Sequence, residues 1–534
     1  MSKEAESDDG LEMNFVPFKG IIGDIKRRLP YYADDYKKGF NSKVLASILF
    51  LFFACLANAI AFGGLTGLVT GNEIGTIEMI IATAAGGIVF AIFSGQPLTI
   101  LGGTGPIVIF TGLLYQVCES FGYPFLPVYA WVGIWSSLFM IICAVFNTSA
   151  IMSFFTRFTD EIFAALIAVI FIVEAVKDMS RGFFPEEGQP MMADVALLTL
   201  LLGLGTYIVA RILKNFSRTP YTSRGIRNFI SDFGPAIAIA VMTILALQLP
   251  DVTSKLSAPT IPAEFTPTYT LEDTGKPRPW LIDLWVVETK VIFLAIIPAL
   301  MATILLFLDQ NITTRIVNSP GHKLKKGAGY HLDLLVVGLI TGVCSIFGLP
   351  WIVAATVHAV NHVKSLANMK VIDQGDQKKE VIDTVIENRI SPLIIHVMIA
   401  IALLPAVLGY IQLIPMAVLF GLFLFMGFAT LNGIQFWERI MLWVTDKTLY
   451  PNTHYVQKVP IAVINKFTVI QVGGLVGLWI VKSAKPWGIF FPIVIAMLVP
   501  LRIYLNKIFK PEHLNLLDSE EEEDEIDENE NHHV

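Results

Sequence analysis

The sequence carries little charge for its length. Only 16% of its 534 residues are charged, 54% are hydrophobic, and the mean hydropathy is +0.63. Soluble proteins carry about 25% charged residues, and a soluble chain of this length would fold as several domains, each with a polar surface. The few charges cannot cover those surfaces. The composition therefore excludes a disordered protein, a secreted disulfide scaffold and most cytosolic enzymes, and it predicts a polytopic membrane protein.

Cysteine is also scarce, and motifs of catalysis are missing. The four cysteines (Cys55, Cys118, Cys143 and Cys344) are scattered within or beside apolar runs without a CxxC pair, which is typical of small buried hydrophobic side chains. No nucleophile elbow, P-loop or dinucleotide fingerprint occurs in a suitable context, and the glycine-rich stretches lie in apolar segments that suit close helix packing. We expect no enzyme activity, no cofactor and no nucleic-acid partner.

Long hydrophobic runs dominate what is present. A helix needs about 20 apolar residues to cross a bilayer, and on that basis the sequence predicts fourteen spans, of which the eleventh and twelfth run together at Pro415. The stretch 224–233, before the seventh span, reads either as an interfacial helix or as a loop. The predicted spans are 44–68, 76–94, 97–117, 128–149, 159–179, 192–214, 233–250, 286–310, 331–347, 350–365, 389–411, 412–432, 463–482 and 486–508.

Positive charge divides unevenly between alternate loops. With the N-terminus inside and fourteen spans, 30 of the 38 Lys and Arg residues fall on the inner side and 8 on the outer side or at outer span ends. This split is a strong positive-inside signature, and it predicts that both termini are cytoplasmic. The inner charges lie in 1–43, at Arg157, and in 211–227, 315–326, 364–389, 439–466 and 502–510.

Negative charge is concentrated near the C-terminus. The net charge is -7, but residues 518–530 contain ten carboxylates, and mutual repulsion keeps such a stretch from packing. We therefore predict three parts: a cytoplasmic N-terminal segment (1–43), a transmembrane domain (44–510) and a disordered acidic cytoplasmic tail (511–534).

Two predicted spans contain backbone that a continuous helix does not tolerate. In the third span, Pro97 leads an extended piece that ends at two glycines, after which Thr104 could cap a new helix with Pro106 in its first turn. In the tenth span, Pro350 leads a β-branched piece, and a short helix could begin near Thr356. Non-helical backbone survives in a membrane only where it is buried in protein or lines a cavity.

These two spans are seven apart in a chain of fourteen. Interrupted spans at matching positions in two halves indicate a transporter site, and an odd offset makes the second half inverted. Two helix N-termini would then face each other near the midplane, where their free N–H groups and positive dipole ends favour an anion. The alternative is two kinked helices without a ligand.

Asp309 and Thr313 are candidates for a cation site. Asp309 ends a long apolar run, and Thr313 follows one helical turn later on the same face. Carboxylate and hydroxyl oxygens suit Na⁺, and they also suit a proton. The alternative is an acidic side chain that reaches the membrane surface. His358, with His362 one turn later, is a candidate titratable group near the anion site, whereas a metal site is disfavoured because no supporting carboxylate stands beside the pair.

The chain resembles the bicarbonate transporter family from about residue 14 to 517. This family comprises chloride–bicarbonate anion exchangers, sodium-coupled bicarbonate cotransporters and, more distantly, borate transporters. The motifs that carry the resemblance are long and specific. They are DIKRRLPYY (24–32), FGG (62–64), GQPLTILGGTGP (95–106), TRFTDEIFA (156–164), ISDFG (230–234), FLDQNIT (307–313), KLKKGAGYHLDL (323–334), LPWIVAATV (349–357), IPMAVLFGLFLFMG (414–427) and LWIVKS (478–483).

The resemblance implies an all-α membrane fold with a 7+7 inverted repeat of fourteen segments and short extended pieces in the broken third and tenth spans. It implies a core domain (about 44–149 and 286–411) and a gate domain (about 159–250 and 412–508), with a homodimer formed through the gate. Transport would follow an elevator-like alternating-access mechanism, with the anion between the third- and tenth-span half-helices.

Single positions bear on the transported ions. Anion exchangers of the family typically carry Glu at the position of Asp309 and Arg at that of His358, whereas sodium-coupled members carry Asp at the first. The chain is therefore similar to the sodium-coupled group except at His358, which matches neither group and leaves chloride or proton coupling open. We expect an integral membrane protein, of the plasma membrane, that carries Na⁺ together with bicarbonate or carbonate.

The expected site follows from the same positions. Asp309 and Thr313 would bind Na⁺, and hydroxyls and backbone N–H groups of a second set would bind the anion. That second set is Thr99, Thr104, Gly105, Thr356, Val357 and His358. The alternatives are a sodium-independent chloride–bicarbonate exchanger, a borate exporter and, from another class, a non-transporting membrane scaffold. The acidic tail resembles a segment proposed in the family to recruit carbonic anhydrase; a solvated tail without a partner is the simpler interpretation.

Overall fold

The computed structural model describes residue 11 and residues 15–184, 191–262, 264–271, 275–374, 377–451, 453–484 and 487–518. The chain forms two compact units, the first made of Met1–Ala150 and Phe171–Met426 and the second of Ile151–Ile170 and Gly427–Val534. The core and gate domains implied by the family resemblance are defined by relative motion during transport, whereas the two units are defined by packing. The division into core and gate therefore stays a prediction.

The first unit is almost entirely helical. Its elements before residue 250 are α1 (Lys19–Arg28), η1 (Leu29–Tyr31), α2 (Tyr32–Lys37), α3 (Ser42–Val69), α4 (Thr76–Phe93), β1 (Leu101–Gly102), α5 (Gly105–Phe121), α6 (Phe125–Val145), the end of α7 (Arg157–Ser180), η3 (Arg181–Phe183), α8 (Ala193–Asn215), η4 (Phe216–Arg218) and α9 (Arg224–Leu247).

The elements from residue 250 onward include three strands, of which β2 pairs with β1 and β3 pairs with β4. They are α10 (Pro250–Thr253), α11 (Thr289–Leu294), α12 (Ile296–Val317), η5 (Pro320–His322), α13 (Tyr330–Ile346), β2 (Val353–Ala354), α14 (Thr356–Leu366), β3 (Ala367–Gln374), β4 (Gln377–Val385), α15 (Ile390–Ile401), α16 (Pro405–Ile411) and the start of α17 (Met416–Leu431).

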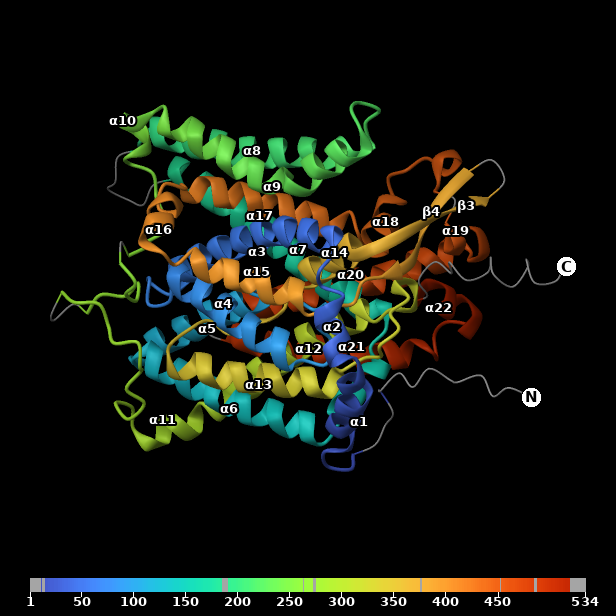
Figure 1. Cartoon of the computed structure of the whole chain (residues 1–534), viewed down its shortest axis with the longest axis horizontal. Coiled ribbons are helices and arrows are strands. Elements are labelled where there is room, and N and C mark those ends of the chain that lie inside the picture. The colour runs from blue at the N-terminus through green and yellow to red at the C-terminus, as the bar shows by residue number, and fades with distance from the viewer. Residues whose placement is uncertain are drawn as a thin grey trace, which may run out of the picture. The chain divides into compact units, whose positions relative to one another are not determined.

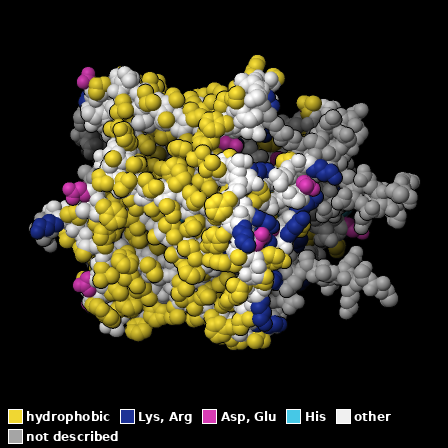
Figure 2. Space-filling view, in the orientation of Figure 1, with side chains coloured by type: hydrophobic (Ala, Val, Ile, Leu, Met, Phe, Trp, Pro, Cys, Tyr) yellow, Lys and Arg dark blue, Asp and Glu magenta, His cyan; other side chains and the backbone are white. Residues whose placement is uncertain are grey.

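The long helices of this unit run side by side, with α1, α2 and the β3–β4 hairpin at one end and α10, α11 and α16 at the other (Figure 1). Hydrophobic side chains cover most of the face in Figure 2, and Lys and Arg gather at the end that carries α1 and α2. Exposed apolar residues on these helices include Leu49, Phe53, Leu339 and Val343. An apolar belt of this kind is typical of a surface that faces lipid.

The second unit contains α18 (Gln435–Met441), η6 (Lys447–Leu449), α19 (His454–Lys458), α20 (Ile461–Ser483), η7 (Trp487–Phe490), α21 (Phe491–Leu505) and α22 (Pro511–Asp518), together with most of η2 (Thr148–Phe154) and the start of α7. Its centre is Arg439, which is fully buried and pairs with Glu161 at 2.5 Å. Arg439 also donates to Gln471 Oε1 at 2.9 Å. The pair is therefore neutralised inside the unit, as a buried charge requires.

Among the residues that the structure describes, eight helices are long and apolar enough to cross a membrane, or up to ten if each of two bent helix pairs forms one span. Two shorter apolar helices, Gly105–Phe121 and Tyr330–Ile346, follow in length. The mostly helical fold with short extended pieces in the third and tenth spans is confirmed. The count of fourteen and the inverted repeat stay predictions.

Three segment predictions require correction. The eleventh span is not one helix but α15 and α16, bent by 85°, because Pro405 lacks an N–H and starts a new helix. It is separated from α17 by residues 412–415. The stretch 224–233 is the beginning of α9, so the seventh span starts earlier than expected. Within the polar segment 366–388, for which the sequence predicts no particular element, strands β3 and β4 pair antiparallel.

The acidic tail begins later than predicted, because residues 511–518 form α22. Leu514 and Leu517 of this helix are buried, and Asp518 pairs with Arg502 and accepts a hydrogen bond from Phe158 N at 2.9 Å. Asp518, the first carboxylate of the acidic run, is thus paired with a cation, so repulsion between carboxylates does not prevent α22 from packing. Residues 519–534, which hold the rest of the predicted tail, lie outside the described residues.

A buried ion cluster joins three of the segments predicted to share the inner side. Asp35 of α2 contacts Lys326 Nζ at 2.5 Å, Arg389 Nε at 3.2 Å and Arg28 Nη2 at 3.3 Å. Arg28 also pairs with Glu387 at 3.1 Å. Residues from 1–43, 315–326 and 364–389 therefore meet at one end of the unit, as the charge pattern required. We call these five residues the Asp35 cluster.

The opposite end of the first unit is fixed by Glu78 in the first turn of α4. Its carboxylate accepts hydrogen bonds from Thr268 N at 2.7 Å, Thr268 Oγ1 at 2.6 Å and Gly75 N at 2.9 Å. Arg278 lies 3.8 Å from the same carboxylate. The long Pro- and Thr-rich segment 251–285 is therefore anchored to the turn between α3 and α4.

Glu73, in that turn, makes stability depend on pH. Burial raises the pKa of its carboxyl from 4.5 to about 7. Arg278 and a hydrogen bond from the N–H of Leu126 oppose this rise, whereas the nearby Glu119 adds slightly to it. Because the pKa is raised on folding, the stabilisation is complete below about pH 4.5 and is lost as the pH rises through about 7. We expect the Tm to fall between pH 5 and pH 7.5, and Glu73→Gln to reduce that fall by a few degrees.

The measurement is thermal unfolding of the purified protein in detergent across this pH range. Glu288→Gln, at an exposed glutamate next to α11, is the matched control and should keep the wild-type pH profile. An unchanged profile in Glu73→Gln would rule out Glu73 as its cause.

Candidate functional site

The two interrupted spans meet through their extended pieces. Strands β1 and β2 pair antiparallel, with Leu101 opposite Ala354 and Gly102 opposite Val353. The pairing continues through Ala355 N, which donates to Ile100 O at 2.8 Å. Each strand thus satisfies backbone groups of the other, which is how irregular backbone remains stable at membrane depth. The juxtaposition predicted from two separate sequence motifs is confirmed.

A helix begins directly after each of these strands. Thr104 is the residue before α5, in extended conformation (φ -127°, ψ 150°), and Pro106 lies in the first turn. Helix α14 begins at Thr356, as predicted, and is preceded by Ala355. The first N–H groups of any helix have no partner within it. Both helix starts therefore offer N–H donors and the positive end of a dipole.

Asp309 is bound to the first of these helix starts. It lies in the middle of α12, is 6% exposed, and accepts a hydrogen bond from Thr104 Oγ1 at 2.7 Å. The residue expected to bind the cation and a residue expected to bind the anion are therefore direct neighbours. A snorkelling surface carboxylate would be exposed, so the burial of Asp309 argues against that alternative.

Thr313 is bound to the second helix start. Its hydroxyl lies 2.6 Å from Thr356 Oγ1 and 3.3 Å from Ala354 O. Asp309 and Thr313 are one turn apart on α12, about 6 Å along its axis. The starts of α5 and α14 therefore flank the same turn of α12, and five of the predicted residues lie around it: Thr104, Gly105, Asp309, Thr313 and Thr356.

The other three predicted residues lie differently. The Val357 side chain is 62% exposed, so only its backbone N–H, in the first turn of α14, remains available to an anion. Thr99 is 1% exposed and its hydroxyl finds no hydrogen-bond partner among the described residues. His358 Nε2 lies 3.2 Å from Ala54 O of α3, so this nitrogen is engaged with α3 rather than with the turn of α12.

Sequence reasoning missed the side chains that hold the strands in place. Gln310 Oε1 accepts from Ala354 N at 3.0 Å, and Asn58 Nδ2 donates to Gly103 O at 3.1 Å. Their partners are 44 and 45 residues away in sequence, and no local pattern predicts such pairs. Gln310 follows Asp309 directly, and this position next to a predicted site residue was the one feature of the sequence that could have pointed to it.

Two buried histidines support backbone carbonyls of the broken third span, one before β1 and one within it. His362 Nδ1 lies 2.9 Å from Leu98 O, and its Nε2 lies 2.7 Å from Ser391 Oγ. His396 Nε2 lies 3.4 Å from Leu101 O. Both ring nitrogens of His362 are therefore used in fixing backbone and side chain, which gives this residue a positioning role.

The entry to the third span is held by a close backbone contact. Asp333 Oδ1 accepts hydrogen bonds from Gly95 N at 2.6 Å and Gln96 N at 3.1 Å. A Cβ atom added to Gly95 would lie 2.6 Å from Gly329 Cα and 3.1 Å from Gly329 O. Since both obstacles are backbone atoms, neither can rotate away.

We therefore expect Gly95→Ala to lower the Tm and to lower the bicarbonate transport predicted from the sequence about tenfold or more. Overpacking of this kind costs about 1–3 kcal/mol, and relief would shift residues 96–104 and move Thr104 away from Asp309. Gly477→Ala in α20, where an added Cβ meets nothing within 4 Å, is the matched control. Initial uptake rates in vesicles, normalised to the amount of reconstituted protein, test the effect; equal rates for the two variants would contradict it.

Residues 16–187 and 181–522 match the family model described as the HCO3- transporter integral membrane domain. The chain belongs to the bicarbonate transporter family. It is similar to the Band 3 anion transport protein of Homo sapiens, with 36% identity over 98% of this chain and 58% of the relative. It is also similar to the electroneutral sodium bicarbonate exchanger 1 of Rattus norvegicus, with 35% identity over 94% of this chain and 51% of the relative.

This member of the bicarbonate transporter family spans about half the length of the curated relatives it matches. The names of these relatives are those of transporters and exchangers, in agreement with the expectation that the chain is not an enzyme. Both sodium-linked and sodium-free names occur among them, so the relatives alone do not assign the coupling ion.

Solved structures support the fold of this bicarbonate transporter family member. The transmembrane domain of the cyanobacterium bicarbonate transporter BicA superimposes with a TM-score of 0.54 at 16% identity, over 82% of this chain and 97% of that one. A murine anion transporter of solute carrier family 26, in the inward-facing state, gives a TM-score of 0.55 at 12% identity, over 95% and 73% of the two chains. At these identities the likeness concerns the fold alone. With the apolar helices, family membership establishes an integral membrane protein.

Proposed function

We propose that this protein is a secondary-active transporter that carries Na⁺ together with bicarbonate or carbonate. The observation that supports it most is the contact between Asp309 and Thr104. A buried carboxylate is costly unless it is paired. Among the described residues, Asp309 has a hydroxyl neighbour but no cationic side chain within ion-pair distance. A bound Na⁺ would supply the missing charge.

The chemistry of the two ions is complementary at this turn of α12. The N–H groups at the starts of α5 and α14 favour an anion, and a carboxylate nearby repels it. Sodium bound by Asp309 and the Thr313 hydroxyl would cancel that repulsion, so that anion and cation bind best together. This mutual dependence is what couples the flux of one ion to that of the other.

The transport step would be elevator-like, with core and gate as the moving parts and a homodimer formed through the gate. We further propose that the protein lies in the plasma membrane with both termini in the cytoplasm, in keeping with the charge distribution. Recruitment of carbonic anhydrase by the acidic tail is a separate and weaker proposal that transport does not need.

The second candidate is a sodium-independent chloride–bicarbonate exchanger. The 36% identity with the Band 3 anion transport protein favours it. A borate exporter comes third. Both retain the paired strands and the helix starts, and they differ from the first proposal in not requiring Asp309 to bind a cation.

The deciding experiment is flux through the full chain in proteoliposomes with Na⁺, Cl⁻ and borate varied separately and the membrane potential recorded. We expect bicarbonate-driven pH change that requires Na⁺ and persists without Cl⁻. Flux that requires Cl⁻ and not Na⁺ would establish the exchanger, and borate flux alone would establish the third candidate. No flux with any of these ions would favour a non-transporting scaffold.

A further inference from the structure

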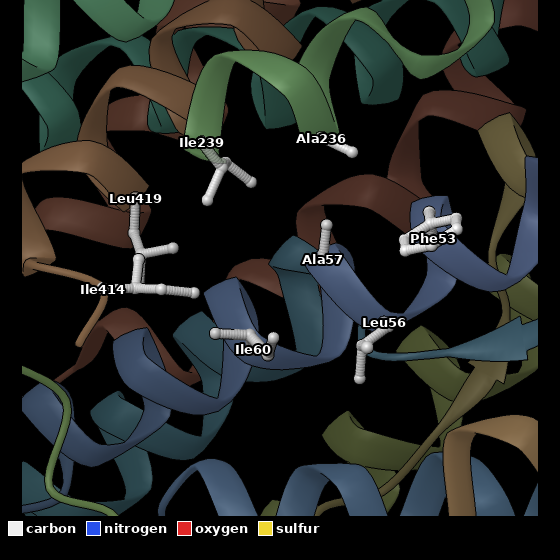
Figure 3. Close-up of a pocket in the computed structure, with 8 residues that line it drawn as sticks. All are labelled: Phe53, Leu56, Ala57, Ile60, Ala236, Ile239, Ile414 and Leu419. Atoms are coloured by element: carbon white, nitrogen blue, oxygen red, sulfur yellow. The ribbon is translucent and has the colours of Figure 1, made fainter. Parts of the chain in front are cut away.

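An apolar slot lies between α3, α9 and the start of α17. Its volume is about 130 Å³, and the eight residues labelled in Figure 3 line it. Phe53, Ala57 and Ile60 come from α3, Ala236 and Ile239 from α9, and Leu419 from α17. The small Ala57 and Ala236 side chains leave the space that larger residues would fill.

The lining decides which kind of molecule the slot suits. All of its side chains are aliphatic or aromatic, so a water molecule there would find none of the polar side chains that hold buried water. A dry apolar cavity of about 150 Å³ binds a six-carbon hydrocarbon, and the slot is of similar size. Because α3 and α9 are both long enough and apolar enough to cross a membrane, the hydrocarbon that surrounds the slot is lipid.

The depth of the slot matches the reach of a lipid tail. Lys43 lies in the first turn of α3, and Phe53 is ten residues later, a distance of about 15 Å along the helix. This equals half of the ~30 Å hydrocarbon thickness of a bilayer. A lipid with its headgroup level with Lys43 would therefore place the end of its acyl chain in the slot.

The path from Lys43 to the slot is lined by aromatic rings. Phe233 of α9 lies 6.1 Å from Phe50 and 5.7 Å from Phe53 of α3, between ring centroids. Phe229 stacks on Phe233 at 4.3 Å. These rings bridge α3 and α9 on the Lys43 side, so the apolar surface is continuous from the slot toward that end.

The charged residues near the two ends of α3 and α9 indicate which lipid headgroup would bind. Lys43 Nζ donates to Ala367 O and to Asn368 Oδ1, which leaves the third of its three donors for a ligand. Lys364 of α14 is exposed, and the contact between Ser365 and Ser47 at 2.6 Å keeps its helix beside the first turns of α3. At the other end of α9 the charged residue that follows is the exposed Asp251.

We propose that the slot binds the acyl chain of an anionic phospholipid from the leaflet on the Lys43 side, with the headgroup held by Lys43 and Lys364. The lipid then packs against α3 at Ala57, next to Asn58, which donates a hydrogen bond to Gly103 O directly after β1. An anionic lipid thus becomes a structural neighbour of the helix that supports the ion site, whichever ions are carried.

The test uses the full chain in phosphatidylcholine vesicles that contain a phosphatidylserine with a photoactivatable group at the end of one acyl chain. Cross-linked positions are read by peptide mass spectrometry. We expect labelling of the α3 and α9 residues of the slot, and at least a tenfold decrease in Ala57→Phe, whose ring fills the space. Ala240→Phe adds the same ring at an exposed position of α9 outside the slot and should label like wild type.

A second arm tests the headgroup. The same photoactivatable chain on phosphatidylcholine should label the slot several-fold less, and Lys43→Gln with Lys364→Gln should remove the difference between the two lipids. Elution as a single species from a sizing column verifies folding, and Ala236→Leu replaces Ala57→Phe if the latter fails. Unchanged slot labelling in the filled variant, or equal labelling by both lipids in wild type, would overturn the proposal.

Discussion

Asp309→Asn is expected to abolish Na⁺-dependent bicarbonate uptake and to leave a folded membrane protein. Asparagine has the shape of aspartate, and its carbonyl oxygen can still accept the hydrogen bond from Thr104 Oγ1, but it carries no charge. Two unit charges 4 Å apart at an effective dielectric constant of 20 attract by about 4 kcal/mol. Losing that attraction lowers the apparent Na⁺ affinity by about 100-fold or more.

The measurement is the Na⁺ dependence of initial uptake in proteoliposomes. Asp309→Glu keeps the charge and should retain partial Na⁺ dependence with weaker affinity. Asp251→Asn removes an exposed acid outside the site and should behave like wild type. Wild-type Na⁺ dependence in Asp309→Asn would exclude this residue from the cation site.

Asp35→Asn is expected to destabilise the first unit by about 3–5 kcal/mol, the cost of removing one partner from a buried ion pair. Asp35 is fully buried and contacts Arg28, Lys326 and Arg389, each at most 6% exposed. Arg389 also donates to Ala91 O at 3.0 Å and Ser94 O at 2.7 Å, at the end of α4 and the entry to the broken third span. Unpaired charge in the Asp35 cluster would therefore disturb the site as well as the fold.

Asp34→Asn provides the matched control, since this neighbouring acid is 37% exposed and pairs with Lys38 and Lys326. Exposed ion pairs contribute about 0–1 kcal/mol, so its Tm should stay close to that of wild type. Thermal unfolding in detergent, followed by the fraction of protein that elutes as a single species, measures both. Equal Tm values for the two variants would show that the Asp35 cluster does not stabilise the unit.

The site could be predicted from sequence where its chemistry is local. Pro97, the glycines before Thr104, and Pro106 determine the break and the new helix within a dozen residues, and the structure has α5 begin at Gly105. The spacing of Asp309 and Thr313 is likewise set by helix geometry. The contacts Asp309–Thr104 and Thr313–Thr356 turned these separate predictions into one site.

Errors arose where packing competed with composition. Segment 366–388 is dominated by polar residues, and its hydropathy predicted no element there, whereas strands β3 and β4 pair through their backbones. Asp518 belonged to an acidic run by composition, yet Arg502 pairs with it and α22 forms. For Asp518, a partner on another helix supplied the charge that the local sequence did not show.

The sequence by itself determined that the chain is a membrane protein, where its spans break, and which family it resembles, because hydropathy, Pro and Gly act over a few residues. Only the tertiary structure decided which groups hold the breaks in place. Asp333 fixes Gly95 from 238 residues away, and His362 reaches Leu98 across 264. Such pairs form because buried polar groups must find partners, and which partner is near depends on how the helices pack.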